Sequence, residues 1–333
     1  MDVSIVIVSW NTRDVLRDCL RSLHERAGDA ALETIVVDNH SADGSAEMIA
    51  AEFPAVRLIR NDDNRGFAAA NNQGIAVAHG RYVLLLNSDT LIHDAAIEKA
   101  VEFADAHPDA GIVGCQTRGR RGNLQYNCYL FPSLLNVALS LTRLQQLFWS
   151  HRFFNRARFG WWDYQSEREV DAVAGCFMLA RREAIQQVGP MSEEYFMYSE
   201  DTDWCLRMRR AGWKTMYTPK AVITHLGRCS SSQAPMDMHL LERRSLLMFL
   251  ERKSGRATRA AANLMFCIAS LLRVPLVGMK RLSAGRSEGV VRQWELAVAV
   301  LRFHLFGRLP TSIASVGTSR PGAGRTPCVE SSP

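Results

Sequence analysis

The sequence lacks the cysteine patterns of a secreted or zinc-binding protein. Its eight cysteines include no Cys-x-x-Cys pair and show no regular spacing, so neither a disulfide framework nor a zinc knuckle is indicated. The first residues, Met1 to Val6, carry no basic segment ahead of their apolar run, unlike a secretory leader. These features predict a reducing, cytoplasmic compartment with free thiols.

A glycine-rich dinucleotide turn is also missing. The first apolar run, residues 3–9, is followed by Trp10 and Asn11, where a nucleotide-dependent oxidoreductase would need closely spaced glycines. No long uncharged apolar run is present either. The most apolar window, residues 261–279, contains Arg273 and Pro275, which makes it too short and too charged for a typical membrane span.

The charge of the chain is unevenly distributed. The 333 residues are 47% apolar and 22% charged, with a net charge of +6, as in a folded protein of one large domain or two small ones. From Gly227 onward the chain has 16 Lys and Arg and 6 Asp and Glu, a net charge of about +10. The part before Gly227 has 24 Lys and Arg and 28 Asp and Glu, a net charge of about −4. A basic tail can bind nucleic acid, bind an anionic membrane surface, or merely favour solubility.

Short β-branched runs alternate with amphipathic helical patterns in the first 90 residues. Runs at 3–9, 34–38, 56–59 and 82–86 predict parallel strands in an open α/β sheet. Ligands of such sheets bind beyond the carboxyl ends of the strands. Polar residues follow all four runs, although each could also be ordinary turn chemistry. They are Ser9, Asn11, Asp38, Asn39, Asn64, Arg65, Asn87, Ser88 and Asp89.

The middle of the chain is less regular. Residues 118–171 mix basic and aromatic side chains, as expected of an acceptor-side lid or of a covering helix with an ordered loop. Residues 170–179 predict a strand around Gly175. Residues 213–217 and 221–225 predict two short strands, with His225 at a strand end.

Three carboxylates lie close together in the segment 196–204. Glu200, Asp201 and Asp203 stand among bulky apolar and aromatic residues, which favours a base of raised pKa or a cation site. The alternative is the first turn of a helix over 202–211, capped by Asp201.

The basic tail predicts helices. Patterns at 239–250, 261–272 and 291–305 combine apolar stripes with cations, which is typical of helices that lie in a bilayer interface or pack on a partner. Nucleic acid is disfavoured because the tail would leave much Leu, Val and Phe exposed. We therefore expect a basic, membrane-associating helical region over 233–309 and a disordered tail over 310–333.

Several of these stretches together resemble the motifs of family 2 glycosyltransferases of the GT-A fold, in the rhamnosyltransferase-like subgroup. The resemblance spans about residues 3–232 and implies an open, Rossmann-like sheet with helices on both faces as the catalytic domain, 1–232. The matching stretches are residues 3–11, 36–39, 41–45, 64–67, 70–72, 84–90, 175–182, 195–207 and 221–225, with Gly74.

The resemblance implies inverting transfer of a sugar from a nucleoside diphosphate donor. Asp38 matches the acid that holds the pyrimidine ring, a role suited to a carboxylate acceptor, and Arg65 would contact the diphosphate. The nucleotide-sugar-binding set that follows is Ser9, Asn11, Asp38, Asn39, Asn64, Arg65, Asn72, Asn87 and Ser88.

It also implies a divalent cation, Mg²⁺ or Mn²⁺, held by Asp89 and His225. Asn87 stands where many members have a first Asp. Glu200 and Asp201 match the catalytic pair that carries the base. The base is assigned to Asp201, which would take the proton from the acceptor hydroxyl in a single displacement. The supporting residues are Glu200, Asp203, Gly175 and Trp204.

The expected enzyme extends a lipid-linked glycan in cell-envelope polysaccharide synthesis, at the cytoplasmic face of the membrane. The subgroup favours dTDP-rhamnose as donor over another donor such as a UDP-hexose. An inactive sugar-nucleotide-binding protein is the main rival, since Asn87 departs from the metal motif. A structural membrane adaptor would explain the tail but not the acids.

Overall fold

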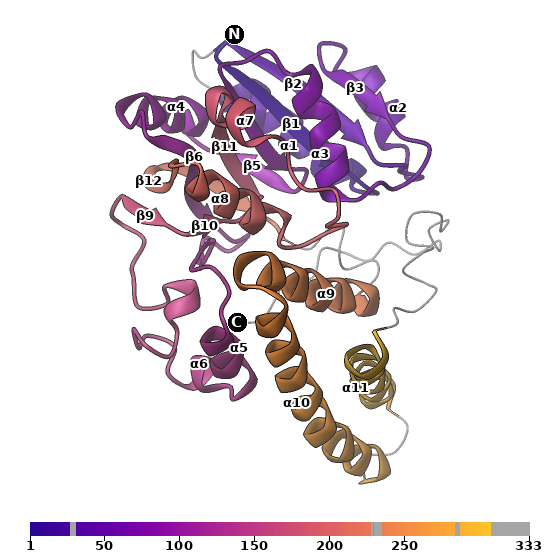
Figure 1. The fold of residues 1–333 in the computed structure, drawn as a ribbon. Helices are drawn as coiled ribbons and strands as arrows, with labels where there is room; N and C mark the ends of the chain where they lie inside the picture. The colour runs from indigo at the N-terminus through magenta and orange to yellow at the C-terminus, as the bar shows by residue number, and fades with distance from the viewer. Residues whose placement is uncertain (27–30, 228, 230–234, 284–286, 308–333) are drawn as a thin grey trace.

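The computed structural model describes residues 1–26, 31–227, 229, 235–283 and 287–307. Within these residues ten strands form one mixed sheet, and a group of long helices lies below it (Figure 1). The order along the sheet is β3-β2-β1-β4-β11-β6-β12-β5, with β7 paired to β6 and β9 to β12. The predicted open α/β sheet followed by a helical region is confirmed.

The first half of the sheet is parallel, as its strand–helix alternation predicts. Its side chains alternate between two cores, so that Ile5 and Ile7 face one and Val6 faces the other. Each core is covered by helices, which places helices on both faces. The elements are β1 (Val3–Ser9), α1 (Arg13–Arg26), β2 (Leu32–Asp38), α2 (Ser45–Glu52), β3 (Arg57–Arg60), α3 (Phe67–Val77) and β4 (Tyr82–Asn87).

The second half contains antiparallel pairs. Strand β11 lies between β4 and β6 and runs antiparallel to both. The elements up to the insertion are β5 (Thr90–Ile92), α4 (Ala96–Ala106) and β6 (Ala110–Arg118). Those after it are β9 (Arg168–Val170), β10 (Ala172–Val173), β11 (Phe177–Arg181), α7 (Arg182–Val188), α8 (Glu200–Arg210) and β12 (Lys214–His225).

Two strand predictions need correction. Residues 170–179 are not one strand, because β10 pairs with β8 in a separate two-stranded sheet and a loop around Gly175 precedes β11 of the large sheet. Residues 213–225 are not two strands but the single β12, whose register against β6 shifts between Thr218 and Val222. The shift accommodates Pro219, which has no N–H to give to a ladder.

The insertion over 118–171 is partly core. Phe159, Trp162 and Tyr164 are buried, and Trp162 stacks on Tyr164 at 4.2 Å between ring centroids. A lid function for the whole segment stays a prediction, but these aromatics pack into the sheet domain. The elements here are β7 (Leu124–Gln125), β8 (Cys128–Tyr129), α5 (Leu134–Leu141), α6 (Leu144–Leu147) and η1 (Arg156–Arg158).

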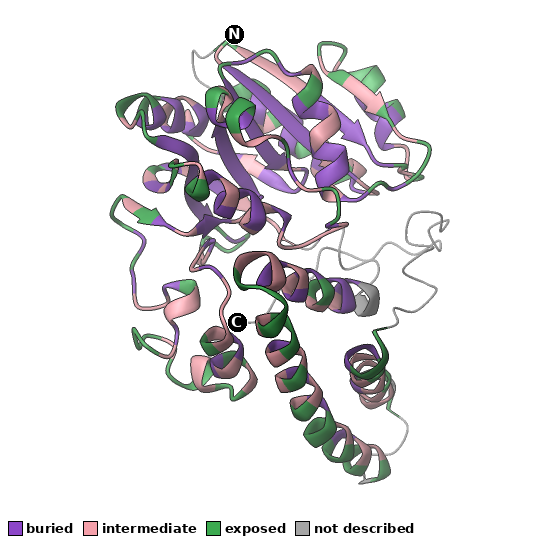
Figure 2. Ribbon diagram, viewed as in Figure 1, coloured by how far each residue is buried: buried purple, intermediate pink, exposed green. Residues whose placement is uncertain are grey.

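The C-terminal helices are α9 (Pro235–Ser254), α10 (Arg256–Ser283) and α11 (Glu288–Phe306). Helix α9 adds Phe249 to the core of the sheet domain, and a domain boundary at 232 stays a prediction. Helix α10 is longer than the predicted 261–272 and includes Pro275. By length and composition it is long and apolar enough to cross a membrane, contrary to the expectation for residues 261–279, and only 22% of its most apolar window is buried, as its exposed lower turns show (Figure 2). The predicted disordered tail, 310–333, lies outside the described residues.

The expectation of free thiols holds for most described cysteines. Cys229 departs from it because its sulfur is disulfide-bonded; irregular cysteine spacing does not exclude a single bond. The free cysteines are Cys19, Cys115, Cys128, Cys176, Cys205 and Cys267.

Helix α3 packs closely on β1 at Gly74. A Cβ atom there would lie 2.3 Å from Cγ1 of Val6, so Gly74→Ala should overpack the core and lower the free energy of unfolding by about 1–3 kcal/mol. Urea denaturation of the full chain measures this. Gly289→Ala is the matched control, since nothing lies within 4 Å of its added Cβ, and helix propensity should make it neutral or stabilising. Equal stability of the two variants would contradict the close packing.

Candidate active site

The carboxyl ends of three parallel strands bring the predicted polar residues together. Ser9 pairs with Asp38 in the β1–β2 register, and Val8 pairs with Asn87 in the β1–β4 register. The loops that follow these strands therefore share one edge of the sheet, which is where open α/β sheets bind ligands.

Amide side chains join these loops to one another. Asn11 accepts the Ala42 N–H through Oδ1 at 2.8 Å. Asn39 donates to Oδ1 of Asn64 at 2.7 Å and accepts the N–H of Arg65 at 3.1 Å. These amides build the wall of the site, while the Arg65 side chain stays exposed.

Asp38 presents an acceptor that no described residue uses. Its Oδ2 accepts the N–H of Ser41 at 3.1 Å, whereas Oδ1 is buried without a hydrogen-bond partner among the described residues. Burial raises the pKa of this carboxyl. A buried, unpaired acceptor is costly unless a ligand donates to it, so Asp38 is suited to a ligand N–H.

A chain of three hydroxyls runs under the site. Ser9 Oγ lies 3.0 Å from Thr12 Oγ1, which donates to Ser88 Oγ at 3.0 Å. Ser9 is fully buried, so it supports the loop carrying Ser88 and Asp89 from below. Thr12 was not among the predicted site residues, because no local pattern marks its contact with Ser88.

Asn72 lies apart from the Asp38 group. Its Nδ2 donates to the carbonyl of Met191 and to Glu193 Oε1, both at 2.9 Å. Its Oδ1 accepts the N–H of Met191 at 3.0 Å. With both ends of the amide in use, Asn72 fastens α3 to the loop before α8. Its predicted nucleotide contact gains no support from this geometry.

Asp89 and His225 lie side by side, as predicted. His225 Nε2 is 3.3 Å from Asp89 Oδ1 and 3.3 Å from Asn87 Nδ2. Burial alone would raise the pKa of Asp89, but the nearby His225 and the N–H of Cys229 outweigh it and lower that pKa. Asp89 is therefore held as a carboxylate.

Gln125 orients His225 from the insertion. Its Oε1 lies 3.1 Å from His225 Nδ1, and its Nε2 donates to the His225 carbonyl at 2.8 Å. With Nδ1 donating to Gln125, Nε2 is the ring atom that faces Asp89 and Asn87. Gln125 was not predicted, because it stands 100 positions from His225 with no local pattern to mark it.

These donors fit a divalent cation that shares its coordination with a substrate. The described residues contain no group of three or more His, Cys, Asp or Glu that could hold a metal alone. Asp89 supplies a carboxylate and His225 an oriented imidazole, and Mg²⁺-type ions commonly take one or two protein ligands together with substrate phosphates. The amide of Asn87 is a neutral neighbour of this pair.

Glu200 and Asp201 open helix α8 after two strained residues. Tyr198 and Ser199 have φ angles of 71° and 65°, a left-handed conformation that is uncommon without glycine. The helix begins at Glu200, two residues earlier than predicted. Asp201 Oδ1 accepts the N–H of Thr202 at 2.6 Å, and Oδ2 accepts the N–H of Gly175 at 3.1 Å.

Burial raises the pKa of both acids. Glu200 is 5% exposed, and its Oε2 has no hydrogen-bond partner among the described residues. Burial, and then the charge of Asp201, raise the Glu200 pKa well above its ordinary value. Burial also raises the Asp201 pKa, against the hydrogen bonds from Thr202 and Gly175. Asp201 is the better-solvated acid of the pair and the better candidate base.

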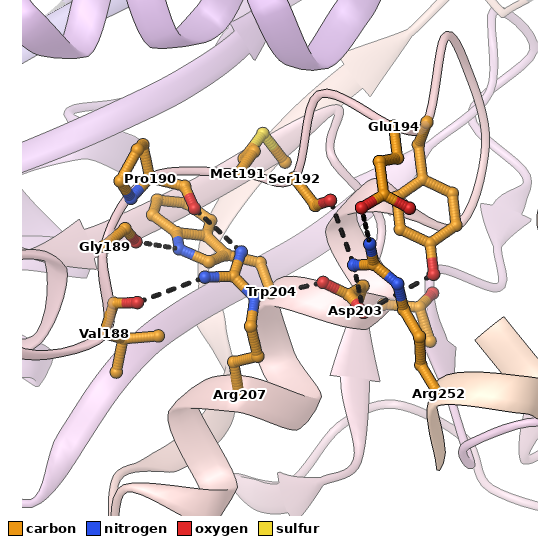
Figure 3. Close-up of polar contacts among 12 residues, drawn as sticks. Val188, Gly189, Pro190, Met191, Ser192, Glu194, Asp203, Trp204, Arg207 and Arg252 are labelled. Carbon is orange, nitrogen blue, oxygen red and sulfur yellow. Dashed lines mark hydrogen bonds and ion pairs between the residues drawn. The ribbon is translucent and has the colours of Figure 1, made fainter. Parts of the chain in front are cut away.

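Asp203 and Trp204 serve the fold. Asp203 Oδ2 accepts from Arg207 Nε at 3.0 Å, and Trp204 Nε1 donates to the Gly189 carbonyl at 2.9 Å. Figure 3 shows both side chains engaged with the loop 188–195. Their predicted supporting roles in the site stay predictions.

The loop around Gly175 lies between the two groups of acids. The Cys176 carbonyl accepts the N–H of Asn87 at 3.2 Å, while the Gly175 N–H binds Asp201. Burial raises the pKa of the Cys176 thiol to about 12, and the charges of Asp89 and Asp201 both add to the shift. Both carboxylates therefore lie within electrostatic reach of this one thiol.

The sequence matches the family model described as glycosyltransferase like family 2 over residues 1–244. The chain belongs to this glycosyltransferase family. The sheet order, the Asp89–His225 pair and the acids of α8 are thus parts of a glycosyltransferase.

Two rhamnosyltransferases are among its relatives. The N-acetylglucosaminyl-diphospho-decaprenol L-rhamnosyltransferase of Mycobacterium tuberculosis is 28% identical over 263 residues, covering 75% of this chain and 85% of that protein. The rhamnosyltransferase WbbL of Escherichia coli is 27% identical over 225 residues, covering 65% of this chain and 80% of that protein.

Solved glycosyltransferase structures share the fold. The mannosyltransferase PcManGT from Pyrobaculum calidifontis, in complex with GDP-Man and Mn²⁺, superposes with a TM-score of 0.56 at 16% identity. The match covers 92% of this chain and 88% of that one, so it includes the C-terminal helices as well as the sheet. At this identity the likeness shows the fold alone.

The buried Glu200 should make the stability of this glycosyltransferase depend on pH. Its folded pKa lies above the ordinary 4.5, so the cost of burying its charge is absent below that value and grows as the pH rises. Glu200→Gln should therefore raise Tm by at least about 2 °C near pH 8 and by less near pH 5. Differential scanning fluorimetry at the two pH values measures this.

The control is Glu102→Gln, which removes an exposed charge from α4 and should give the same small change at both pH values. A Glu200→Gln effect that did not grow with pH would contradict the raised pKa of the buried Glu200 carboxyl.

Proposed function

We propose that this glycosyltransferase transfers rhamnose from dTDP-rhamnose to a hydroxyl of a lipid-linked glycan, with inversion at the anomeric carbon. The carrying observation is that Asp201 and the Asp89–His225 pair flank one loop, residues 174–176. A base on one side and a diphosphate-binding group on the other is the arrangement that a single displacement needs.

The sugar and the acceptor are inferred from the relatives. The Mycobacterium tuberculosis relative is named for rhamnose transfer to a decaprenol-linked N-acetylglucosamine, and the Escherichia coli relative is named a rhamnosyltransferase. Asp38 can accept the ring N–H of thymine or of uracil, so it does not distinguish dTDP-rhamnose from a UDP-hexose, the alternative donor. Arg65 is exposed at the same sheet edge and can bind the diphosphate.

Asp89 and His225 would hold the cation, Mg²⁺ or Mn²⁺. When bound there, such an ion would offset negative charge on the leaving diphosphate. The rest of the site acts through its own side chains: Asn87 and Gln125 keep the His225 ring in place, and Asp89 remains ionised.

Asp201 is the proposed base. As the acceptor oxygen forms its bond to the anomeric carbon, the hydroxyl proton passes to Asp201 and the bond to the diphosphate oxygen breaks. The two hydrogen bonds to Oδ1 and the one to Oδ2 fix the carboxylate in one orientation. Glu200, with its raised pKa, holds its proton beside it and limits repulsion between the two acids.

Asp201→Asn should lower kcat by about 10²–10⁴-fold and leave the donor's thermal shift unchanged. Because burial raises the Asp201 pKa above its ordinary 3.8, wild-type activity should fall as the pH drops through that raised value and protonates the base. Rhamnose transfer measured from pH 4 to 8, together with donor-induced Tm shifts, tests this.

Wild-type turnover in Asp201→Asn would remove the base assignment. A donor that raises Tm in the wild type without any transfer to any acceptor would instead favour the inactive sugar-nucleotide-binding protein.

The membrane contact is proposed for one face of α10. Its exposed apolar residues recur every three or four positions, and Arg273 and Lys280 border them. This pattern suits a helix in the interface of an anionic membrane, which would bring the enzyme to a lipid-linked acceptor at the cytoplasmic face. The exposed residues are Leu264, Ile268, Leu271, Leu272, Leu276, Met279 and Leu282.

Leu272→Glu with Leu276→Glu should weaken binding to anionic vesicles by at least about 10-fold, because two leucines would no longer enter the bilayer. Vesicle co-sedimentation of the full chain measures this. Gln293→Glu, which adds a charge at an exposed position of α11, is the control and should bind like the wild type. Equal binding of all three proteins would exclude α10 as the membrane contact.

A further inference from the structure

The loop that precedes the catalytic acids, residues 192–199, is held from two sides. On one side the N–H of Phe67 donates to the Phe196 carbonyl at 2.8 Å, and Gly66 allows the close approach, since a Cβ there would lie 2.4 Å from that oxygen. On the other side lies α9, the first of the C-terminal helices. The loop is therefore fixed between the nucleotide-binding turn and α9.

Arg252 of α9 binds this loop and helix α8 together (Figure 3). Its Nη2 lies 2.7 Å from Glu194 Oε1, and its Nη1 donates to Ser192 Oγ at 2.9 Å. The same Nη1 lies 3.5 Å from Asp203 Oδ1, and Asp203 is only 3% exposed at its side chain. The Arg252 guanidinium thus joins the start of the loop, at Ser192 and Glu194, to Asp203 in α8, and Glu200 and Asp201 lie between these two points.

Arg207, the other cation on Asp203, cannot do the same. It lies on α8 itself, four residues after Asp203, and its remaining bonds go to the carbonyls of Val188 and Pro190. Arg252 comes from a separate helix, so it fixes α8 and the loop relative to the rest of the molecule.

A second contact from α9 lies nearer to the acids. Ser245 Oγ donates to the Met197 carbonyl at 2.8 Å, and Ser245 is 3% exposed. Met238 and Leu241 of α9 pack on the apolar residues of the loop and on Trp10.

The loop needs such support because of its backbone. Tyr198 and Ser199 both have positive φ angles directly before Glu200, and residues in this region persist only where their surroundings hold them. Release of the loop would let these two residues relax and would turn Glu200 and Asp201 away from the loop at Gly175.

We propose that Arg252 and Ser245 are positioning residues for Glu200 and Asp201, so that α9 belongs to the catalytic apparatus as well as to the membrane-facing region. This rests on the proposed function. Helix α9 also leads through Gly255 directly into α10, the helix with the exposed apolar face. The same helix pair would then hold the membrane contact and the catalytic loop.

The test compares four variants of the full chain: Arg252→Gln, Arg252→Lys, Ser245→Ala and the control Arg81→Gln. Arg81 also makes two ion pairs, to Asp2 at 3.0 Å and to Asp105 at 2.6 Å, but it precedes β4 at the end of the sheet opposite Asn87. The readouts are kcat, the donor KM, Tm, and backbone hydrogen exchange of residues 196–202.

We expect Arg252→Gln to lower kcat by about 10- to 100-fold, which is the effect expected when a catalytic group is slightly misplaced. The donor KM should stay within about 2-fold of the wild-type value. Arg252→Lys should keep part of the kcat that Arg252→Gln loses, since lysine retains the positive charge but not the planar guanidinium that binds two partners at once. Exchange at 196–202 should quicken in Arg252→Gln and Ser245→Ala and stay unchanged in Arg81→Gln.

A kcat and an exchange rate for Arg252→Gln no different from those of Arg81→Gln would overturn the proposal. If Arg252→Gln does not fold, Ser245→Ala decides by the same two readouts, because it removes only a hydroxyl. A wild-type chain without transferase activity would defeat the proposed function instead, and hydrogen exchange would still decide whether α9 positions the loop.

Discussion

The hydrogen bond from the Gly175 N–H to Oδ2 of Asp201, at 3.1 Å, is the contact on which the site depends. It joins helix α8 to the loop that connects β10, in the two-stranded sheet, to β11 of the large sheet. The next residue, Cys176, accepts the N–H of Asn87, at the start of the segment that carries Asp89. The two groups of acids are thereby held on opposite sides of three residues, and a Cβ at position 175 would lie 3.3 Å from the Phe67 ring, a tight contact.

The site is stable only as part of a larger arrangement. The buried oxygens of Asp38 and Glu200 that have no hydrogen-bond partner in the described part of the chain and the left-handed Tyr198 and Ser199 all oppose folding. The surrounding sheet, the hydroxyl chain beneath Ser88 and the contacts from α9 offset this cost. Such local departures from favourable geometry are expected where a protein binds a ligand or performs chemistry.

The sequence predicted what depends on local pattern. Asp38 follows a β-branched run and His225 ends a strand, so their places at the sheet edge could be inferred, and the family motifs gave both residues a role. Gln125 and Arg252 could not be found in this way. Each acts on a residue about 50 to 100 positions away through a contact between separate elements, and no spacing marks such a pair. The strand expected over 170–179 failed for a related reason, because apolar residues continue across the bend at Gly175.

The configuration of the product tests the proposed role of Asp201 most directly. Proton NMR of the glycan formed from dTDP-rhamnose and an N-acetylglucosaminyl-diphospho-lipid would report the anomeric centre of the transferred sugar. A base at Asp201 acting in a single displacement predicts a configuration opposite to that of the donor. A product with the donor's configuration would contradict it, because retention requires two displacements or attack from the side of the leaving group.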